Sequence, residues 1–512
     1  MGILKWTYIP PLLIYASAGV SGLTNIVGMF FLKDYLNLSA AFIASIGFWA
    51  GIPWALKMPV GFIVDKCWKH KNLLVYLGAS VIFLSLLIMY FLLTDRTFME
   101  KYLKAESWFI LSALLTPIGY VIQDVIADAM TVEAVESNYS KISKNKNNFD
   151  FKKEHTLIQM YGRFAIILGS LLVSLINVLI FRGVSIEDEI VVLQAYSNIY
   201  LLSLTIPLLS ISGVVISSIL GKGSRIFIDN KKFNSLDYKI FFGSLVFVSI
   251  AIILGGLKVK FAQEIVLCTS LLLIAILMYF LTKTLSKKEK YSIVGTAFII
   301  FIYRAMPTPG PGINWFEIDV LKFDQAFLAS LSLTAALLTL VGMLLFKNTM
   351  IKSSIAKLFL FLSIISSLLY LPSIFMYYGL HNYTSQITNG IVDARFIALI
   401  NTAVESPISQ IAMIPLLAWI ARNAPMRYKA TFFAVFASFT NLSLSAKELF
   451  TKYLNQIFEI KREVKNLKTN EVINKSDYSN LDELLVSVTL ITFLVPVITV
   501  IIIQKTRFKS KD

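Results

Sequence analysis

Long apolar blocks recur along the whole chain, separated by short polar loops. Block 397–421 reads IALINTAVESPISQIAMIPLLAWIA and holds one ionisable side chain. A helix needs about 20 apolar residues to cross the hydrocarbon core. The pattern therefore predicts an all-α polytopic membrane protein. Fourteen blocks qualify: about 8–31, 40–64, 72–93, 107–133, 157–181, 195–219, 240–257, 264–282, 291–315, 325–346, 355–379, 390–421, 430–447 and 484–504.

Positive charge alternates between successive loops. KCWKHK, KISKNKNNFDFKK, GKGSRIFIDNKK, TKTLSKKEK, KNTMIKSSIAK, RNAPMRYK and the tail KTRFKSKD are all basic. Cytoplasmic loops carry such an excess of Lys and Arg. We therefore expect an even number of spans and cytoplasmic termini, and we call the opposite side the outer side.

The order of the spans predicts three parts. We expect a six-helix bundle at 1–220, a basic linker with a peripheral two-helix hairpin free of buried charge at 221–290, and a second six-helix bundle at 291–512. A polar segment at about 446–483 falls on the outer side. Its composition predicts a solvated and loosely ordered chain without chemistry of its own.

Composition excludes several classes of function. The chain is 56% hydrophobic and 15% charged, where soluble domains carry about 25% charged residues. Its net charge of +16 fits basic loops beside anionic lipid better than nucleic-acid binding. Two separated cysteines and three scattered histidines predict no disulfide, metal site or cofactor. We expect a multi-pass protein of the cell membrane, acting as a monomer.

Charged side chains interrupt the fourth and fifth spans. Asp124 and Asp128 are four residues apart, hence on one helix face, with Gln123 beside them. The fifth span carries Gln159 and Arg163. An ionised carboxylate at the bilayer centre costs roughly 2.5–3.5 kcal/mol, so such residues normally face a cavity or each other. These residues predict either a site for a solute or a proton, or a plain ion-pair network that locks two helices.

The second half of the chain contains further polar residues within its spans. Arg304 precedes PTPGPG (307–312), which cannot continue a regular helix in lipid. This break predicts either a lining of the transport path or a simple exit loop. Arg395 and Glu405 of the twelfth span are candidate cavity residues. Glu133, near the cytoplasmic end of the fourth span, is the better candidate for an interfacial charge.

The loop after the second span carries a recognisable motif. GFIVDKCWKHK resembles the G-x-x-x-D-[RK]-x-G-[RK]-[RK] loop of the major facilitator superfamily, with Trp68 in place of the second glycine. The resemblance implies two six-helix halves and a cytoplasmic gate. The gate residues are Gly61, Asp65, Lys66, Lys69 and Lys71.

Several stretches in a shared order resemble the folate–biopterin transporter family, a branch of that superfamily. They are QDVIADAMTVEAV, GRFAIILG, the P-T-P break and segment 421–454. Within the last, Lys429 stands where a glutamate is usual. The resemblance implies an alternating-access carrier for a folate, a pterin or a related anion, commonly coupled to protons.

We therefore expect a secondary transporter of a small organic anion. Arg163, Arg304 and Arg395 would attract the anion, because guanidinium stays charged and offers paired donors. Asp124 or Asp128 would take up a proton. The alternatives are another solute (a peptidoglycan fragment, a nucleotide or a drug) and a non-transporting sensor of the same fold. No H-E-x-x-H, G-x-S-x-G or P-loop motif favours an enzyme.

Overall fold

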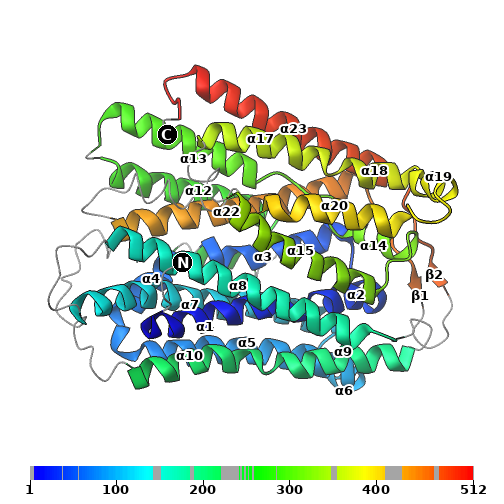
Figure 1. Ribbon diagram of the computed structural model, residues 1–512, viewed down its shortest axis with the longest axis horizontal. Coiled ribbons are helices and arrows are strands. Elements are labelled where there is room, and N and C mark those ends of the chain that lie inside the picture. Colours follow the sequence, from blue (N-terminus) through cyan, green and yellow to red (C-terminus); the bar gives the residue numbers. More distant parts are fainter. Residues whose placement is uncertain are drawn as a thin grey trace. The chain divides into compact units, whose positions relative to one another are not determined.

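The chain is helical along most of its length in the computed structural model (Figure 1). It divides into two compact units: unit 1 is Met1–Gly28 with Pro59–Phe242, and unit 2 is Met29–Met58 with Gly243–Asp512. The structure describes residues 5–36, 38–55, 57–141, 151–184, 189–220, 259–283, 285–346, 354–409, 429–465 and 472–510, with short stretches of 242–255.

Unit 1 contains the helices of the first, third, fourth, fifth and sixth predicted spans. They are η1 (Trp6–Tyr8), α1 (Ile9–Val20), η2 (Ser21–Thr24), α5 (Lys71–Thr94), α7 (Ala105–Lys141), α8 (Phe151–Phe181), α9 (Glu189–Ser203) and α10 (Ile206–Leu220), with η3 (Trp68–His70) and α6 (Arg96–Glu100) in the loops. Helices α2 (Asn25–Tyr35) and α4 (Lys57–Lys66) each continue from one unit into the other.

Unit 2 combines a short N-terminal piece with the rest of the chain. Its helices are α3 (Ala40–Ala55), α12 (Ala262–Leu281), α13 (Lys287–Arg304), α14 (Pro311–Asp319), α15 (Gln325–Leu345), α17 (Ile355–Leu368), α18 (Leu371–Tyr377), α19 (Leu380–Ile387), α20 (Ala394–Ser409), α22 (Lys429–Ile457) and α23 (Leu481–Lys505). Helix α3 packs along α22, where a Cβ on Gly51 would lie 2.4 Å from the Ser445 hydroxyl oxygen. Glycine is therefore required for this close packing.

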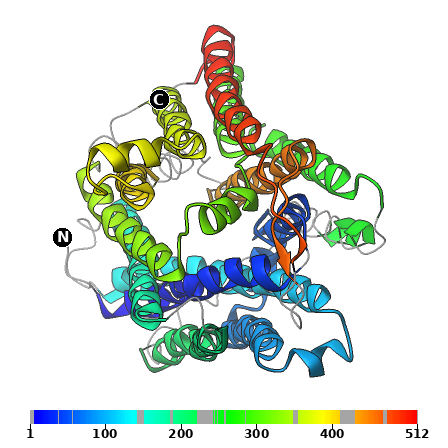
Figure 2. The same cartoon turned by 90° about the vertical axis from the view of Figure 1, so that its right-hand side faces the viewer.

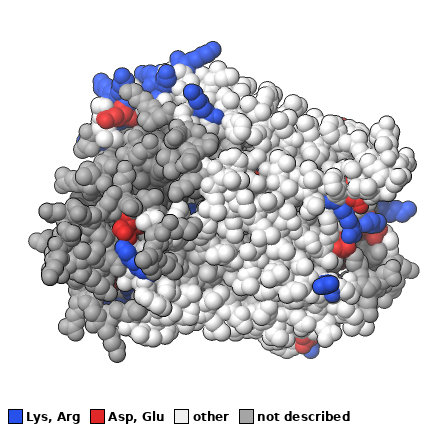
Figure 3. Space-filling view, viewed as in Figure 1, with Lys and Arg blue, Asp and Glu red and all other residues white. Residues whose placement is uncertain are grey.

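A membrane environment explains the exposed surface. Nine helices within the described residues are long and apolar enough to span a bilayer. Most of the described surface in Figure 3 carries no charged side chain, as contact with lipid tails requires. The chain is thus an integral multi-pass membrane protein. The predicted count of fourteen includes 240–257, half of which lies outside the described residues.

Helix α12 of the predicted hairpin makes polar contacts with α3 and α22. The Gln263 amide donates to the Ser45 hydroxyl of α3 at 2.7 Å. Lys452 of α22 lies 3.5 Å from Glu264, and Tyr453 also donates to that carboxylate. Glu264 lies in the first turn of α12. It is the one charged residue of that helix, and the apolar residues after it made it inconspicuous in the sequence.

The outer polar segment is ordered where the structure describes it, which contradicts the predicted loose chain. Helix α22 continues to Ile457, and β1 (Val464–Lys465) then pairs antiparallel with β2 (Val472–Asn474). These two short strands are an exception to the predicted all-α fold. Ile460 is 3% exposed. A few buried side chains thus order a segment whose average composition is polar.

Candidate functional site

Tyr15 and Asp128 form the centre of a polar cluster within unit 1. The Tyr15 hydroxyl of α1 donates a hydrogen bond to the Asp128 carboxylate of α7, and Tyr15 is buried. Gly162 of α8 provides the space, since a Cβ there would lie 2.9 Å from Cδ2 and Cε2 of the tyrosine ring. Carbon atoms normally approach to about 3.5–4.0 Å. A glycine at 162 therefore lets the ring reach Asp128.

Two more glycines bring α1 and α8 into backbone contact. A Cβ on Gly19 would lie 2.1 Å from the carbonyl oxygen of Ile166, and a Cβ on Gly169 would lie 2.8 Å from that of Ala16. Neither position has room for a side chain. This close packing fixes Tyr15 over the turn of α8 that carries Gly162 and Arg163.

The other predicted residues of unit 1 surround this pair. The Tyr15 hydroxyl interacts electrostatically with the charged groups of Asp124, Asp128 and Arg163. The Gln159 amide donates to the Thr131 hydroxyl at 3.3 Å, which itself donates to the Asp128 backbone carbonyl at 2.7 Å. Four of the predicted residues therefore belong to one neighbourhood built by α1, α7 and α8.

Gln123 lies apart from this neighbourhood although it adjoins Asp124 in sequence. Its amide nitrogen is 2.8 Å from the Ser210 hydroxyl of α10 and 3.4 Å from the Val75 carbonyl of α5, and the residue is 1% exposed. These contacts hold three helices together. Consecutive residues on a helix project about 100° apart, which accounts for the separation.

The candidates of unit 2 occupy several different places. Arg304 is the last residue of α13, and two residues separate it from the PTPGPG break. The Arg395 guanidinium lies 2.7 Å from Asp324 and also donates to the Lys322 carbonyl. This pair joins the beginnings of α15 and α20. Glu405 on α20 is exposed, and its charge acts on Tyr370.

The PTPGPG break is stabilised by α22. Thr451 accepts a hydrogen bond from the Thr308 backbone nitrogen at 3.0 Å, and the Asn455 amide donates to the Pro309 carbonyl at 3.1 Å. Gly310 adopts a φ of +74°, which favours glycine. The backbone groups freed by the break thus find partners on a neighbouring helix.

The gate motif has one described ion pair. Lys71 contacts Glu133 of α7 and lies 4.5 Å from the centre of the Trp68 ring, while Lys69 is exposed. A Cβ on Gly61 would meet its nearest atom at 3.9 Å, an ordinary contact. This position therefore has room for a small side chain. The side chains of the other two motif residues, Asp65 and Lys66, lie outside the described residues.

Sequence reasoning missed three polar residues that the structure brings to attention. Tyr15 looked like an ordinary aromatic of the first span, and only Gly162 and Gly169, one heptad apart, hinted at close packing there. Glu448 of α22 lies against Gly47 of α3. Burial raises the pKa of Glu317, which lies on α14 beyond the ninth predicted span, to about 7.

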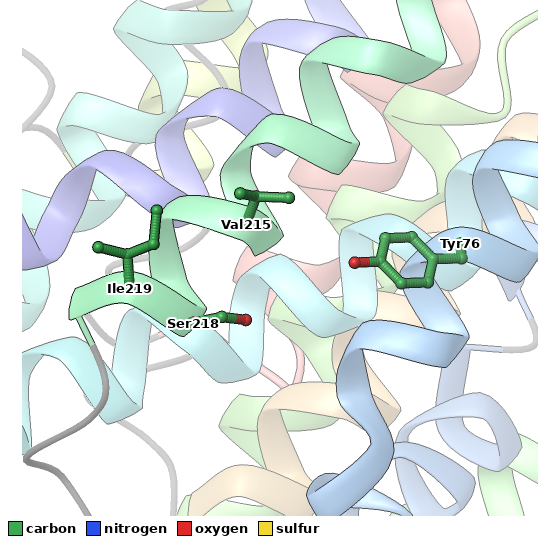
Figure 4. A pocket seen from close by; sticks show the side chains of 4 residues that line it. All are labelled: Tyr76, Val215, Ser218 and Ile219. Atoms are coloured by element: carbon green, nitrogen blue, oxygen red, sulfur yellow. The ribbon is translucent and has the colours of Figure 1, made fainter.

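A surface groove of about 350 Å³ lies between α5 and α10, away from the predicted residues (Figure 4). It is lined by Tyr76, Val215, Ser218 and Ile219. Among the described side chains, no group of three or more His, Cys, Asp or Glu could hold a metal ion. The polar cluster around Tyr15 is therefore the strongest candidate site in the described part of the chain.

Solved structures of transporters share this fold at low sequence identity. A POT family transporter in complex with a thioalcohol conjugated peptide is 12% identical, with a TM-score of 0.62 over 99% of this chain and 96% of its own. A mutant of the nucleoside transporter NupG is 11% identical, with a TM-score of 0.57 over 98% and 100%. A D-xylose-proton symporter is 13% identical, with a TM-score of 0.52 over 96% and 95%. The expected major facilitator fold is confirmed.

The family expected from the sequence needs correction. A search of curated proteins finds no match. The family model that matches residues 18–512 is that of the BT1 family, and the similar structures described above are named for peptide, nucleoside and xylose transport, not for a folate or a pterin. In place of the folate–biopterin transporter family, the chain belongs to the BT1 family.

Proposed function

We propose that this protein is a secondary active transporter that moves a small organic anion by alternating access, coupled to protons. The observation that carries the proposal is the cluster of Tyr15, Asp124, Asp128 and Arg163 within predicted spans. Titratable groups inside a membrane are costly and typically mark a path for ions or substrates. The names of similar structures, among them a D-xylose-proton symporter, agree with a transport function.

The carboxylates of α7 are proposed to carry the proton. Asp124 and Asp128 are one helical turn apart, and two like charges at low dielectric do not both ionise readily. The Tyr15 hydroxyl donates a hydrogen bond to the Asp128 carboxylate and so joins α1 to this pair. Uptake and release of one proton by this pair would change the charge next to Arg163.

Arg163 is proposed to receive the anion. Its guanidinium remains charged at any physiological pH and offers a fork of donors that suits a carboxylate or a phosphate. While the aspartates are ionised, they compete with the anion for this cation. Protonation would therefore favour anion binding, which links the two transported species.

The solute is to be found by thermal shift and then tested by transport. The purified protein is heated with a panel of anions that includes dipeptides, nucleotides and peptidoglycan fragments, since a ligand raises the unfolding temperature by mass action. Each ligand found this way is then tested for uptake into proteoliposomes. Uptake is measured without a pH gradient, with the lumen more acidic than the outside, and with the lumen more alkaline. A gradient-dependent uptake is expected.

The residue roles are tested in Asp124→Asn, Asp128→Asn and Arg163→Gln. The aspartate variants should lose the response to the pH gradient, and the arginine variant should lose ligand binding. Glu106→Gln, which removes a carboxylate from the first turn of the same helix, is the control and should keep both. If all three variants transport as the unchanged protein does, the cluster is a structural ion-pair network and the assignment is refuted.

A further inference from the structure

The outer ribbon, defined as residues 458–465 and 472–480, connects α22 to α23 (Figure 2). Beyond β1 and β2, Lys461 and Asp477 pair through two backbone hydrogen bonds of 3.0 and 2.8 Å. The residues next to α22 and α23 are therefore paired antiparallel, and a bulge follows between Val464 and Lys465. Such a paired segment can couple the movements of the helices that it contacts.

Apolar side chains anchor this base to α14. A Cβ on Gly312 would lie 3.0 Å from Cγ1 of Ile460, so the isoleucine packs directly against the α14 backbone. The rings of Phe316 and Tyr478 meet edge to face at 5.7 Å. Ile460 also belongs to a buried cluster that contains Ala40 of α3. The ribbon, α14 and the beginning of α3 thus share one core.

Asp319, the last residue of α14, joins the ribbon to the end of the first span. One of its carboxylate oxygens lies 2.6 Å from the Lys33 ammonium group, and the other accepts a hydrogen bond from the Tyr478 hydroxyl. The Lys33 side chain is only 9% exposed and also lies 3.2 Å from Asp34. Both oxygens of Asp319 are therefore engaged.

Arg462 makes a second connection to the same place. It is 6% exposed, and its guanidinium donates to the backbone carbonyl of Leu36, which follows α2. The charges of Asp34 and Asp319 act on this guanidinium. Separating Arg462 from Leu36 would leave a buried cation and a buried carbonyl without their hydrogen bond until water replaced it.

We propose that the outer ribbon is a latch that holds the outer ends of the first two spans against α14. The latch consists of the Arg462 contact with Leu36 and the Tyr478 contact with Asp319. Opening of the path toward the outer side requires both contacts to break. The proposal rests on the alternating-access function proposed above, and it assigns the polar outer segment a gating role.

The latch is tested by access to a buried cysteine. Ala40, 2% exposed within the shared core, is replaced by cysteine after Cys67→Ser and Cys268→Ser. Intact right-side-out vesicles are treated with a membrane-impermeant maleimide. Loss of one hydrogen bond to a charged group shifts the equilibrium between closed and open states by about tenfold or more. We therefore expect roughly tenfold faster labelling in Arg462→Gln and in Tyr478→Phe. Tyr478→Phe keeps the ring and its packing.

Lys475→Gln is the matched control, because it removes a positive charge from an exposed position of the same ribbon. It should label at the unchanged rate. Equal labelling in all variants overturns the latch. If the cysteine at position 40 prevents folding, hydrogen–deuterium exchange of the 36–43 amides replaces the readout, with faster exchange expected in both latch variants and unchanged exchange refuting the latch. The assay uses no solute, so it can succeed even where every transport assay fails.

Discussion

The replacement Gly162→Ala tests whether glycine is what allows Tyr15 to reach Asp128. The new methyl group would lie 2.9 Å from two carbons of the Tyr15 ring, about 0.6–1 Å inside normal contact. Overpacking of this kind costs about 1–3 kcal/mol. The tyrosine or α8 must move, and the hydrogen bond to Asp128 is lengthened or lost.

Gly61→Ala is the matched control, since its methyl group would meet its nearest neighbour at 3.9 Å. Both glycines are helical, so alanine at either position gains about 0.4–1 kcal/mol from the unfolded chain. We therefore expect Gly61→Ala to be neutral or stabilised, and Gly162→Ala to be destabilised by up to about 2 kcal/mol net of that gain.

The assay is reversible unfolding of the purified protein in detergent, followed by a double-mutant cycle with Tyr15→Ala. Removal of the ring should abolish most of the effect of Gly162→Ala, because the two residues are in contact. Equal stability of the two glycine variants would refute the reasoning. So would a loss in Gly162→Ala that persists unchanged without the ring.

Three further predictions concern other contacts. The pKa of Glu317 is about 7 in the folded chain and 4.5 in the unfolded chain, so the unfolded chain loses this proton first as the pH rises. The free energy of unfolding should therefore fall by about 3 kcal/mol between pH 4.5 and pH 7, and thermal unfolding of Glu317→Gln should not show this fall. Asn455→Ala leaves the Pro309 carbonyl without its donor and should lower the unfolding free energy by about 1–2 kcal/mol in denaturant titrations. A double-mutant cycle of Lys71→Gln and Glu133→Gln should give a coupling of about 1 kcal/mol that weakens in high salt.

Each of these expectations can fail in a specific way. An unchanged pH profile in Glu317→Gln would assign the titration to another group. Full stability of Asn455→Ala would show that the break needs no donor from α22. Additive effects of the two gate variants would show that the Lys71 pair with Glu133 contributes nothing beyond its separate residues.

The apolar blocks alone predicted most of the described long helices and their order. The predicted spans 72–93 and 325–346 agree with α5 and α15 to within a residue or so at each end. This success has a physical reason: a backbone in lipid must satisfy its hydrogen bonds within one helix, so an apolar block of sufficient length has one outcome. The same reason explains why the PTPGPG break was recognised.

Partners across helices were decided only by the tertiary structure. Asp124, Asp128 and Arg163 stood out in the sequence because charge is rare in an apolar block, but Tyr15 carried no such mark. Its role depends on a glycine 147 residues away, which permits a contact that no local pattern encodes. The outer ribbon shows the same limit, since a polar average concealed the few buried side chains that order it. The local sequence pattern indicates whether a segment contacts lipid, water or protein. Which other segments it packs against depends on how closely two helix backbones can approach each other.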